Sequence, residues 1–174
     1  EDRGGNIWVG TEGGLACIRK DGNVRAFAGA QGLPSNFINH VTEDSSGTLW
    51  IATSAGLCRW EGNEQSLAAA PAQGNASRPW FKVFRSEGAP TDNIIDALAI
   101  AADQSIWLGT DNGLGKFHHE KFQALPEAER LPGKNVSALL VTHDQILWVG
   151  TATGLFRLQE NKLSAFTKAN GFPD

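Results

Sequence analysis

The chain has 174 residues, of which 41% are hydrophobic and 20% charged, with a formal net charge of −4. This composition is typical of a folded globular domain, and its negative charge gives no general attraction to nucleic acid. No apolar run approaches the roughly 18 residues of a membrane-spanning helix, and the start does not resemble a signal peptide. Two cysteines are too few for a disulfide scaffold or a four-cysteine zinc site. Because the chain contains no methionine, we expect an excised or processed fragment.

The first predicted element is a strand whose residue pattern occurs three more times along the chain. The pattern aliphatic-Trp-aliphatic-small-Thr-x-x-Gly-Leu lies within residues 5–15, 47–57, 104–114 and 145–155. Its tryptophans follow one another at intervals of about 40 residues, with one longer interval, which is the kind of period that marks a repeat architecture. The repeat therefore decides the fold. Its members are Trp8, Trp50, Trp107 and Trp148, followed by Thr11, Thr53, Thr110 and Thr151.

Three further strands are expected around each tryptophan strand. A turn with Asn36, Asn93 or Asn135 introduces an apolar first strand, and Gly-Leu begins the third strand. A closing run ends each unit, at residues 24–27, 80–84, 121–125 and 162–166. No window has the apolar spacing of an amphipathic helix, so we expect almost no helix.

Four strands per unit of about 40 residues are typical of a β-propeller blade. We predict an all-β chain of about four four-stranded antiparallel blades, as a partial or oligomer-completed propeller. The predicted units are approximately residues 1–32, 33–88, 89–131 and 132–174, with a surface insertion at 62–79. The first unit lacks the body of its first strand, so about fifteen strands are expected. The small residues after the tryptophans are expected to let neighbouring sheets approach closely; they are Gly10, Ala52, Gly109 and Gly150.

The residue pattern of the repeat resembles that of the two-component regulator propeller family. The resemblance is carried by residues 32–36, which read Gly-Leu-Pro-Ser-Asn, by residues 43–53 and by residues 1–11. Units three and four depart from it, because Asp103 and Asp144 sit nearer the tryptophan than Asp2 and Asp44 do, which predicts a tightened or shifted hairpin.

The resemblance implies a non-enzymatic sensory or ligand-binding module. In that family such propellers are the extracytoplasmic, periplasmic input of receptors with kinase or cyclase output domains, which implies a small-molecule or oligosaccharide ligand and no cofactor. One alternative is a protein-interaction scaffold, although the Trp-Asp dipeptide of WD repeats is absent. A less favoured alternative is an enzyme like the streptogramin lyases, with His40 and Glu43 as the nearest available pair.

Asn39, His40 and Asp96 are the candidate ligand-binding residues, because they are polar side chains on first strands where the repeat does not require them. The other histidines are interpreted as ordinary surface or partly buried residues. His118 and His119 are adjacent, so on a strand they are expected to face opposite sides and not to share a metal ion. His143 is placed beside a hairpin turn, and no metal site is predicted.

Several other residues are assigned structural roles. Asp2, Asp44, Asp103 and Asp144 are interpreted as turn residues, and the repeat threonines and turn asparagines as groups that satisfy nearby backbone. Cys17 and Cys58 lie on equivalent strands and are expected to be buried free thiols rather than a disulfide. Trp60 and Trp80 lie outside the repeat, so either would be a candidate carbohydrate contact if exposed.

Closure of the ring is the last expectation. Four blades of this size do not readily close a propeller, and an open arc would leave two apolar blade faces uncovered. We therefore expect the chain to be at least a dimer or part of a larger propeller.

Overall fold

The computed structural model describes residues 1–63, 67–68, 80–86, 93–123, 125–126, 130–160 and 162–167. The chain divides into two compact units, Glu1–Arg85 and Ser86–Asp174, which are described separately. Most of the predicted insertion at 62–79, the turn before Asn93 and the C-terminal residues 168–174 lie outside the described residues.

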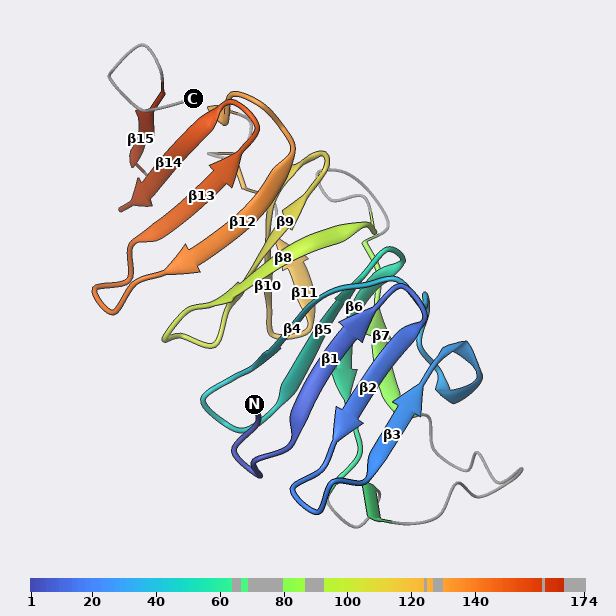
Figure 1. Cartoon of the computed structure of the whole chain (residues 1–174). Coiled ribbons are helices and arrows are strands. Elements are labelled where there is room, and N and C mark those ends of the chain that lie inside the picture. The colour runs from blue at the N-terminus through green and yellow to red at the C-terminus, as the bar shows by residue number, and fades with distance from the viewer. Residues whose placement is uncertain are drawn as a thin grey trace. The chain divides into compact units, whose positions relative to one another are not determined.

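Unit 1 contains two antiparallel sheets (Figure 1). Sheet 1 consists of β1 (Ile7–Thr11), β2 (Gly14–Ile18) and β3 (Val24–Phe27), in that order. The short 3-10 helix η1 (Gly29–Gln31) follows it. Sheet 2 consists of β4 (Ile38–Glu43), β5 (Leu49–Thr53), β6 (Gly56–Trp60) and β7 (Phe81–Phe84).

Unit 2 contains two four-stranded antiparallel sheets. Sheet 3 is formed by β8 (Ile95–Ile100), β9 (Ile106–Thr110), β10 (Gly113–His118) and β11 (Lys121–Gln123). Sheet 4 is formed by β12 (Val136–Val141), β13 (Leu147–Thr151), β14 (Gly154–Gln159) and β15 (Lys162–Phe166). The described part of the chain thus has fifteen strands in four sheets, which confirms the all-β prediction.

Sequence-adjacent strands pair in every sheet because their connections are short turns. The hairpin before the tryptophan strand keeps one geometry throughout: the Asp44 N–H donates to the Thr48 carbonyl, and the Ala101 N–H to the Ser105 carbonyl, each at 2.9 Å. The expected tightening of this hairpin in sheets 3 and 4 is therefore wrong. The turn is the same, but the aspartate stands two positions later in it, at Asp103 in sheet 3. Gln104 (φ 65°) takes the left-handed backbone conformation that Gly47 (φ 86°) has at the equivalent position of sheet 2.

Small residues were predicted at four positions to let neighbouring sheets approach closely. The structure shows such an approach at two of them, Gly10 and Gly109. In unit 1, a Cβ on Gly10 would lie 2.5 Å from Cγ2 of Ile38. In unit 2, a Cβ on Gly109 would lie 2.6 Å from the carbonyl oxygen of Val136. A larger residue at either site would force the two sheets apart, so glycine is required by packing.

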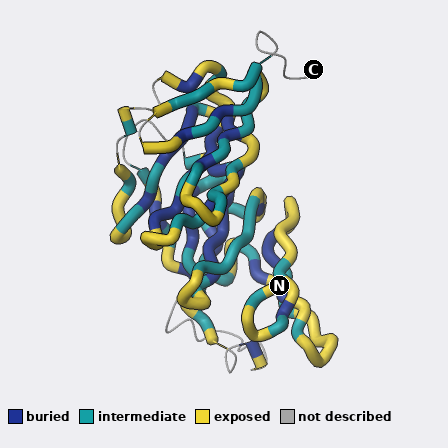
Figure 2. The backbone as a smooth tube through the Cα atoms, turned by 90° about the vertical axis from the view of Figure 1, so that its left-hand side faces the viewer, coloured by how far each residue is buried: buried dark blue, intermediate teal, exposed yellow. Residues whose placement is uncertain are grey.

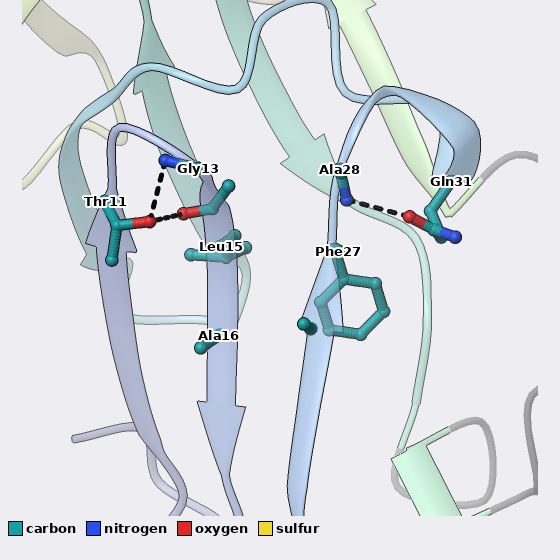
Figure 3. Close-up of a pocket in the computed structure, with 9 residues that line it drawn as sticks. Thr11, Gly13, Leu15, Ala16, Phe27, Ala28 and Gln31 are labelled. Carbon is teal, nitrogen blue, oxygen red and sulfur yellow. Dashed lines mark hydrogen bonds between the residues drawn. The ribbon is translucent and has the colours of Figure 1, made fainter.

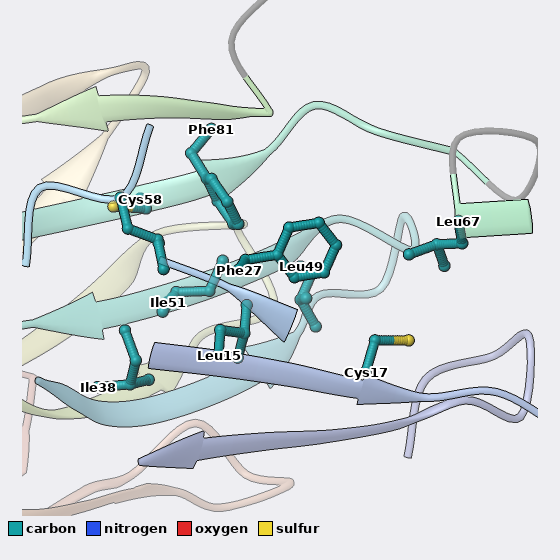
Figure 4. Packing of buried hydrophobic residues seen from close by; sticks show 10 residues of the cluster. Leu15, Cys17, Phe27, Ile38, Leu49, Ile51, Cys58, Leu67 and Phe81 are labelled. Atoms are coloured by element: carbon teal, nitrogen blue, oxygen red, sulfur yellow. The ribbon is translucent and has the colours of Figure 1, made fainter. Parts of the chain in front are cut away.

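The core of unit 1 lies between its two sheets (Figure 4). Leu15, Cys17 and Phe27 from sheet 1 meet Ile51 and Phe81 from sheet 2, all at most 2% exposed. Unit 2 has an equivalent core around Val136, Val149 and Phe156, each fully buried.

Burial is uneven across the four equivalent tryptophan strands (Figure 2). All five residues of β5 are buried, whereas four of the five residues of β1 are exposed. The repeat tryptophans follow this difference: Trp50 is 8% exposed, but Trp8, Trp107 and Trp148 are only half-buried. The four repeat tryptophans are therefore not equally buried, because burial depends on how much of each face a neighbouring sheet covers.

Candidate functional site

The first strands carry the predicted ligand-binding residues at a repeated irregularity. Pairing of β4 with β5 shifts register between Ile38 and His40, which makes Asn39 the extra residue of a β-bulge. The same shift occurs at Asp96 in β8 and at Ser137 in β12. Bulges redirect a side chain and are frequent beside binding sites. Asn39, Asp96 and Ser137 therefore occupy one structural position in three sheets.

In unit 1, Asn39 is exposed and His40 is half-buried next to it on β4. His40 pairs with Ala52, whose side chain is small and fully buried. Burial lowers the pKa of His40, because removal from water disfavours the charged imidazolium. An uncharged imidazole can both donate and accept a hydrogen bond, which suits recognition of hydroxyl or amide groups.

In unit 2, Asp96 belongs to a small polar group. Burial and the nearby Asp111 carboxylate raise the pKa of Asp96 above its ordinary value of 3.8. Asp111 in turn accepts a hydrogen bond from Nδ2 of Asn135 at 2.5 Å. The group thus offers carboxylate acceptors and an amide near the start of β12.

Ser137 and Asp111 were missed from the sequence as candidates. Ser137 precedes two aliphatic residues and carries no charge, so only the bulge identifies it. Asp111 could have been identified, because it follows the repeat threonine at a position where the residue type varies. The other units have Glu12, Ser54 and Ala152 there.

Replacing Asp96 by asparagine is expected to stabilise the protein at neutral pH. The folded-state pKa of Asp96 lies above the unfolded value of 3.8, so the ionised carboxylate destabilises the fold once the pH exceeds its folded pKa. The penalty disappears as the pH falls below 3.8. Thermal melting should give a higher Tm for Asp96→Asn at pH 7 and a smaller difference at pH 3.

Asp144→Asn is the matched control in the same unit. A hydrogen bond from the Thr142 hydroxyl lowers the pKa of Asp144, so the ionised form is favoured in the fold and neutralising it should not stabilise the protein. An Asp96→Asn variant that melts below the wild-type chain at pH 7 would contradict the assigned environment.

The repeat threonines are structural, as expected. The Thr53 hydroxyl donates to the Gly56 carbonyl at 2.8 Å and accepts from the Ala55 N–H at 3.0 Å. Thr11, Thr110 and Thr151 make the same two bonds in their own turns. These hydroxyls are committed to the backbone of the turn.

Two turn aspartates have an additional role that the sequence did not reveal. Oδ2 of Asp2 accepts a hydrogen bond from Nε1 of Trp8 at 2.8 Å, and Oδ2 of Asp44 accepts one from Nε1 of Trp50 at 2.9 Å. Asp103 bonds Ser105 instead, and Asp144 bonds Thr142. The four aspartates are therefore turn residues, as expected, with hydrogen-bond partners that differ between the two units.

The turn asparagines hold the entry to the first strand in two sheets. Oδ1 of Asn36 accepts from the Gly29 N–H at 3.0 Å, and Oδ1 of Asn93 accepts from the Ser86 N–H at 2.9 Å. Asn135 departs from this pattern through its bond to Asp111.

The expectation that His118 and His119 face opposite sides is wrong. His118 ends β10, and His119 begins the turn with φ 48°, so the two rings stack with their centroids 3.9 Å apart. His143 lies in the turn between β12 and β13, as predicted. In the residues that the structure describes, no group of three or more His, Cys, Asp or Glu side chains is arranged to hold a metal ion.

Trp60 and Trp80 do not form an exposed platform. Both are half-buried against the unit 1 core, where their rings stack at 5.4 Å. The Arg25 guanidinium lies 4.6 Å from the centre of the Trp80 ring. Their role is packing, with a cation–π contact over the Trp80 ring.

The two cysteines are free and buried, as expected. Burial raises the pKa of the Cys58 thiol to about 12, with a smaller opposing effect of Arg85. A thiol in this state is not a nucleophile at neutral pH.

Two hollows lie away from the predicted residues. One, of about 280 Å³, is bounded by Thr11, Gly14, Ala16, Phe27 and Gln31 in sheet 1 (Figure 3). Two of its polar groups are engaged in the fold, since Oε1 of Gln31 accepts from the Ala28 N–H at 2.8 Å and the Thr11 hydroxyl is bonded within its turn. The other, of about 360 Å³, is an apolar hollow in sheet 4 around Leu140, Trp148 and Gly150.

Two segments of the repeat match a known protein family. Residues 32–55 and 130–153 match the family model described as two component regulator propeller, which confirms the resemblance in those segments. No curated protein matches the chain.

Solved structures share the fold. The extracellular domain of the hybrid two-component system BT3049 from B. thetaiotaomicron is 24% identical with a TM-score of 0.70, over 89% of this chain and 20% of that one. The corresponding domain of BT4673 from the same organism is 20% identical with a TM-score of 0.72, over 95% and 21%. The chain thus spans about a fifth of the length of these domains.

Virginiamycin B lyase from Staphylococcus aureus is similar as well, at 16% identity and a TM-score of 0.68, over 95% of this chain and 53% of that enzyme. At these identities the likeness shows the fold alone. The four sheets are β-propeller blades, of a fold related to extracellular domains of hybrid two-component systems. No helix among the described residues is long and apolar enough to cross a membrane.

Proposed function

We propose that the chain is a non-enzymatic, ligand-binding segment of a sensory β-propeller, in the extracytoplasmic input region of a two-component or related signalling receptor. The observation that carries the proposal is the match of residues 32–55 and 130–153 to the two component regulator propeller model. That match depends on the specific residues of the repeat. The propeller fold by itself serves many functions and does not identify one.

The bulge position supports a binding role. Its backbone geometry is the same in three sheets, but its side chain changes from Asn39 to Asp96 to Ser137. Each bulge can therefore offer a different polar group to a ligand that binds at its own sheet. A small molecule or oligosaccharide, rich in hydroxyl groups, fits the amide and imidazole groups on β4 in unit 1, and the carboxylate on β8 is a separate candidate contact in unit 2.

The lyase alternative has little support in the described geometry. His40 and Glu43 both lie on β4, but Oε2 of Glu43 accepts a hydrogen bond from the Arg3 N–H at 2.9 Å. His40 and Glu43 are also three positions apart on one strand, so they project to opposite faces. We therefore propose that this chain is not a lyase of this kind.

Calorimetric titration with a panel of neutral, uronic-acid-containing and sulphated oligosaccharides tests the binding role. The wild-type chain is expected to bind a member of the panel, and the Asn39→Ala, His40→Ala, Asp96→Ala triple variant to bind it at least tenfold more weakly. Lys162→Ala is the control, since Lys162 is exposed on the outer strand β15. Unchanged affinity in the triple variant would remove these residues from the site.

Quinupristin tests the enzymatic alternative, because a virginiamycin B lyase structure contains this compound. After incubation with micromolar chain, its chromatographic retention is expected to be unchanged. Conversion to a new product, which is lost in His40→Ala, would favour the lyase function.

A further inference from the structure

Phe37 is the only exposed phenylalanine or tryptophan in the part of the chain that the structure describes. Its side chain is 53% exposed, whereas Phe27, Phe81 and Phe156 are at most 2% exposed in the cores of the two units. A single exposed apolar residue is common on protein surfaces, so its place in the fold decides what it means.

The place of Phe37 is next to the candidate site of unit 1. Phe37 directly precedes β4 and lies two positions before Asn39, the extra residue of the β-bulge. Ile38 stands between them and is buried in the unit 1 core, whereas Phe37 and Asn39 are both exposed. The two side chains therefore point away from the core at the same end of β4, with His40 as the next residue.

Two hydrogen bonds hold the backbone that carries the Phe37 ring. The Phe37 N–H donates to Oγ of Ser35 at 3.0 Å, and the Phe37 carbonyl accepts from the Ser54 N–H at 3.2 Å. Ser54 belongs to the turn after β5, so Phe37 is tied to a second segment of sheet 2. A phenyl ring has only two side-chain torsions, and on a fixed backbone it loses little conformational entropy when a ligand covers it.

The equivalent position is exposed in the other sheets that have a first strand. Ile94 in sheet 3 and Asn135 in sheet 4 also precede the residue that pairs with the repeat threonine, and both are exposed. Asn135 is exposed although β8 of the four-stranded sheet 3 lies beside β12 (Figure 1). Exposure is thus a property of the position, and its chemistry differs: an amide bonded to Asp111 in unit 2, but an aromatic ring in unit 1.

We propose that Phe37 is the stacking residue of the unit 1 site, and that this site takes a neutral pyranose sugar with an apolar face of C–H groups. The inference rests on the proposed ligand-binding function and specifies the ligand. The face of a phenyl ring carries partial negative charge, so it attracts C–H groups while both surfaces leave water. The Asn39 amide and the uncharged His40 imidazole supply donors and acceptors for the hydroxyl groups at the edge of the same sugar.

Saturation-transfer NMR tests which part of a sugar the protein touches. The probes are cellohexaose, laminarihexaose and mannohexaose, and sorbitol is the control because it has the hydroxyl groups of a sugar but no ring face. For the hexasaccharide that binds the wild-type chain, we expect saturation to concentrate on the protons of one face of the pyranose ring. Sorbitol should receive none. Even saturation of both faces would contradict stacking.

Calorimetric titration of the same hexasaccharide tests the residue. Phe37→Ala and Phe37→Leu should each bind about tenfold more weakly, on the scale of stacking between an aromatic side chain and a flat ligand. Leucine keeps an apolar side chain but has no ring face, whereas Phe37→Trp should retain the affinity. Ile94→Ala is the matched control, because it truncates an exposed apolar residue at the equivalent position. Unchanged melting temperatures show that all four variants are folded.

The outcomes separate this inference from the function on which it rests. Wild-type affinity in Phe37→Leu and Phe37→Ala overturns stacking and leaves the polar site in place. Weaker binding in these two variants but not in Asn39→Ala, His40→Ala supports stacking and removes the two polar residues from the site. A wild-type chain that binds none of the three hexasaccharides overturns the sugar specificity proposed here, and the acidic oligosaccharides described above then decide whether a binding function remains.

Discussion

Phe27→Ala is expected to destabilise unit 1 by about 3–5 kcal/mol, the usual cost of removing a buried phenylalanine side chain. Phe27 is 1% exposed, and its ring lies between the two sheets of the unit. It contacts Trp60 edge-on at 4.9 Å and Phe81 edge-on at 5.7 Å, both in sheet 2, so truncation removes aromatic contacts between the two sheets.

Urea denaturation monitored by tryptophan fluorescence measures this effect. Phe37→Ala is the matched control, because it is the same substitution in the same unit at a side chain that is 53% exposed. We expect Phe37→Ala to change the free energy of unfolding by less than about 0.5 kcal/mol, as is usual at exposed sites. Equal losses in the two variants would contradict the described core.

The isolated chain is expected to be at least a dimer at micromolar concentration. One face of sheet 1 is apolar and exposed, with Ile7 at 41%, Val9 at 39%, Ile18 at 38% and Val24 at 66%. In sheet 2, the equivalents of Ile7 and Val9 are buried against a neighbouring sheet. An apolar face of this kind on a folded domain is normally covered by a partner.

Light scattering tests this expectation. Val9→Lys should shift the wild-type chain toward the monomer, because it places a charge in the apolar face. Phe37→Lys is the control, since Phe37 is exposed but lies outside the sheet. A wild-type chain that stays monomeric, near its mass of 18.6 kDa, would contradict the prediction.

The repeated features could be read from the sequence because each is fixed by residues within one hairpin. Thr53, two residues before Ala55 and three before Gly56, can satisfy both backbone groups without help from elsewhere. The close approach at Gly10 and Gly109 was also predictable, because only a small residue permits it.

The remaining features depend on contacts that periodicity does not encode. The bulge at Asn39 adds one residue to a strand without changing its pattern of residue types. The burial of Trp8 depends on a neighbouring sheet, and the stacking of His118 on His119 depends on a left-handed backbone angle. For the same reason, the candidate site was predicted at Asn39, His40 and Asp96 but not at Ser137 or Asp111.

The most direct test of the central claim is to identify what the chain retains and in what form. Immobilised wild-type chain is exposed to a mixture of neutral and acidic oligosaccharides, and the bound and unbound fractions are analysed by mass spectrometry. The account predicts that wild type retains an oligosaccharide of unchanged mass, and that the Asn39→Ala, His40→Ala, Asp96→Ala variant does not retain it. Retention that is equal in the two proteins, or a shortened or modified product in the unbound fraction, would contradict a non-enzymatic binding module.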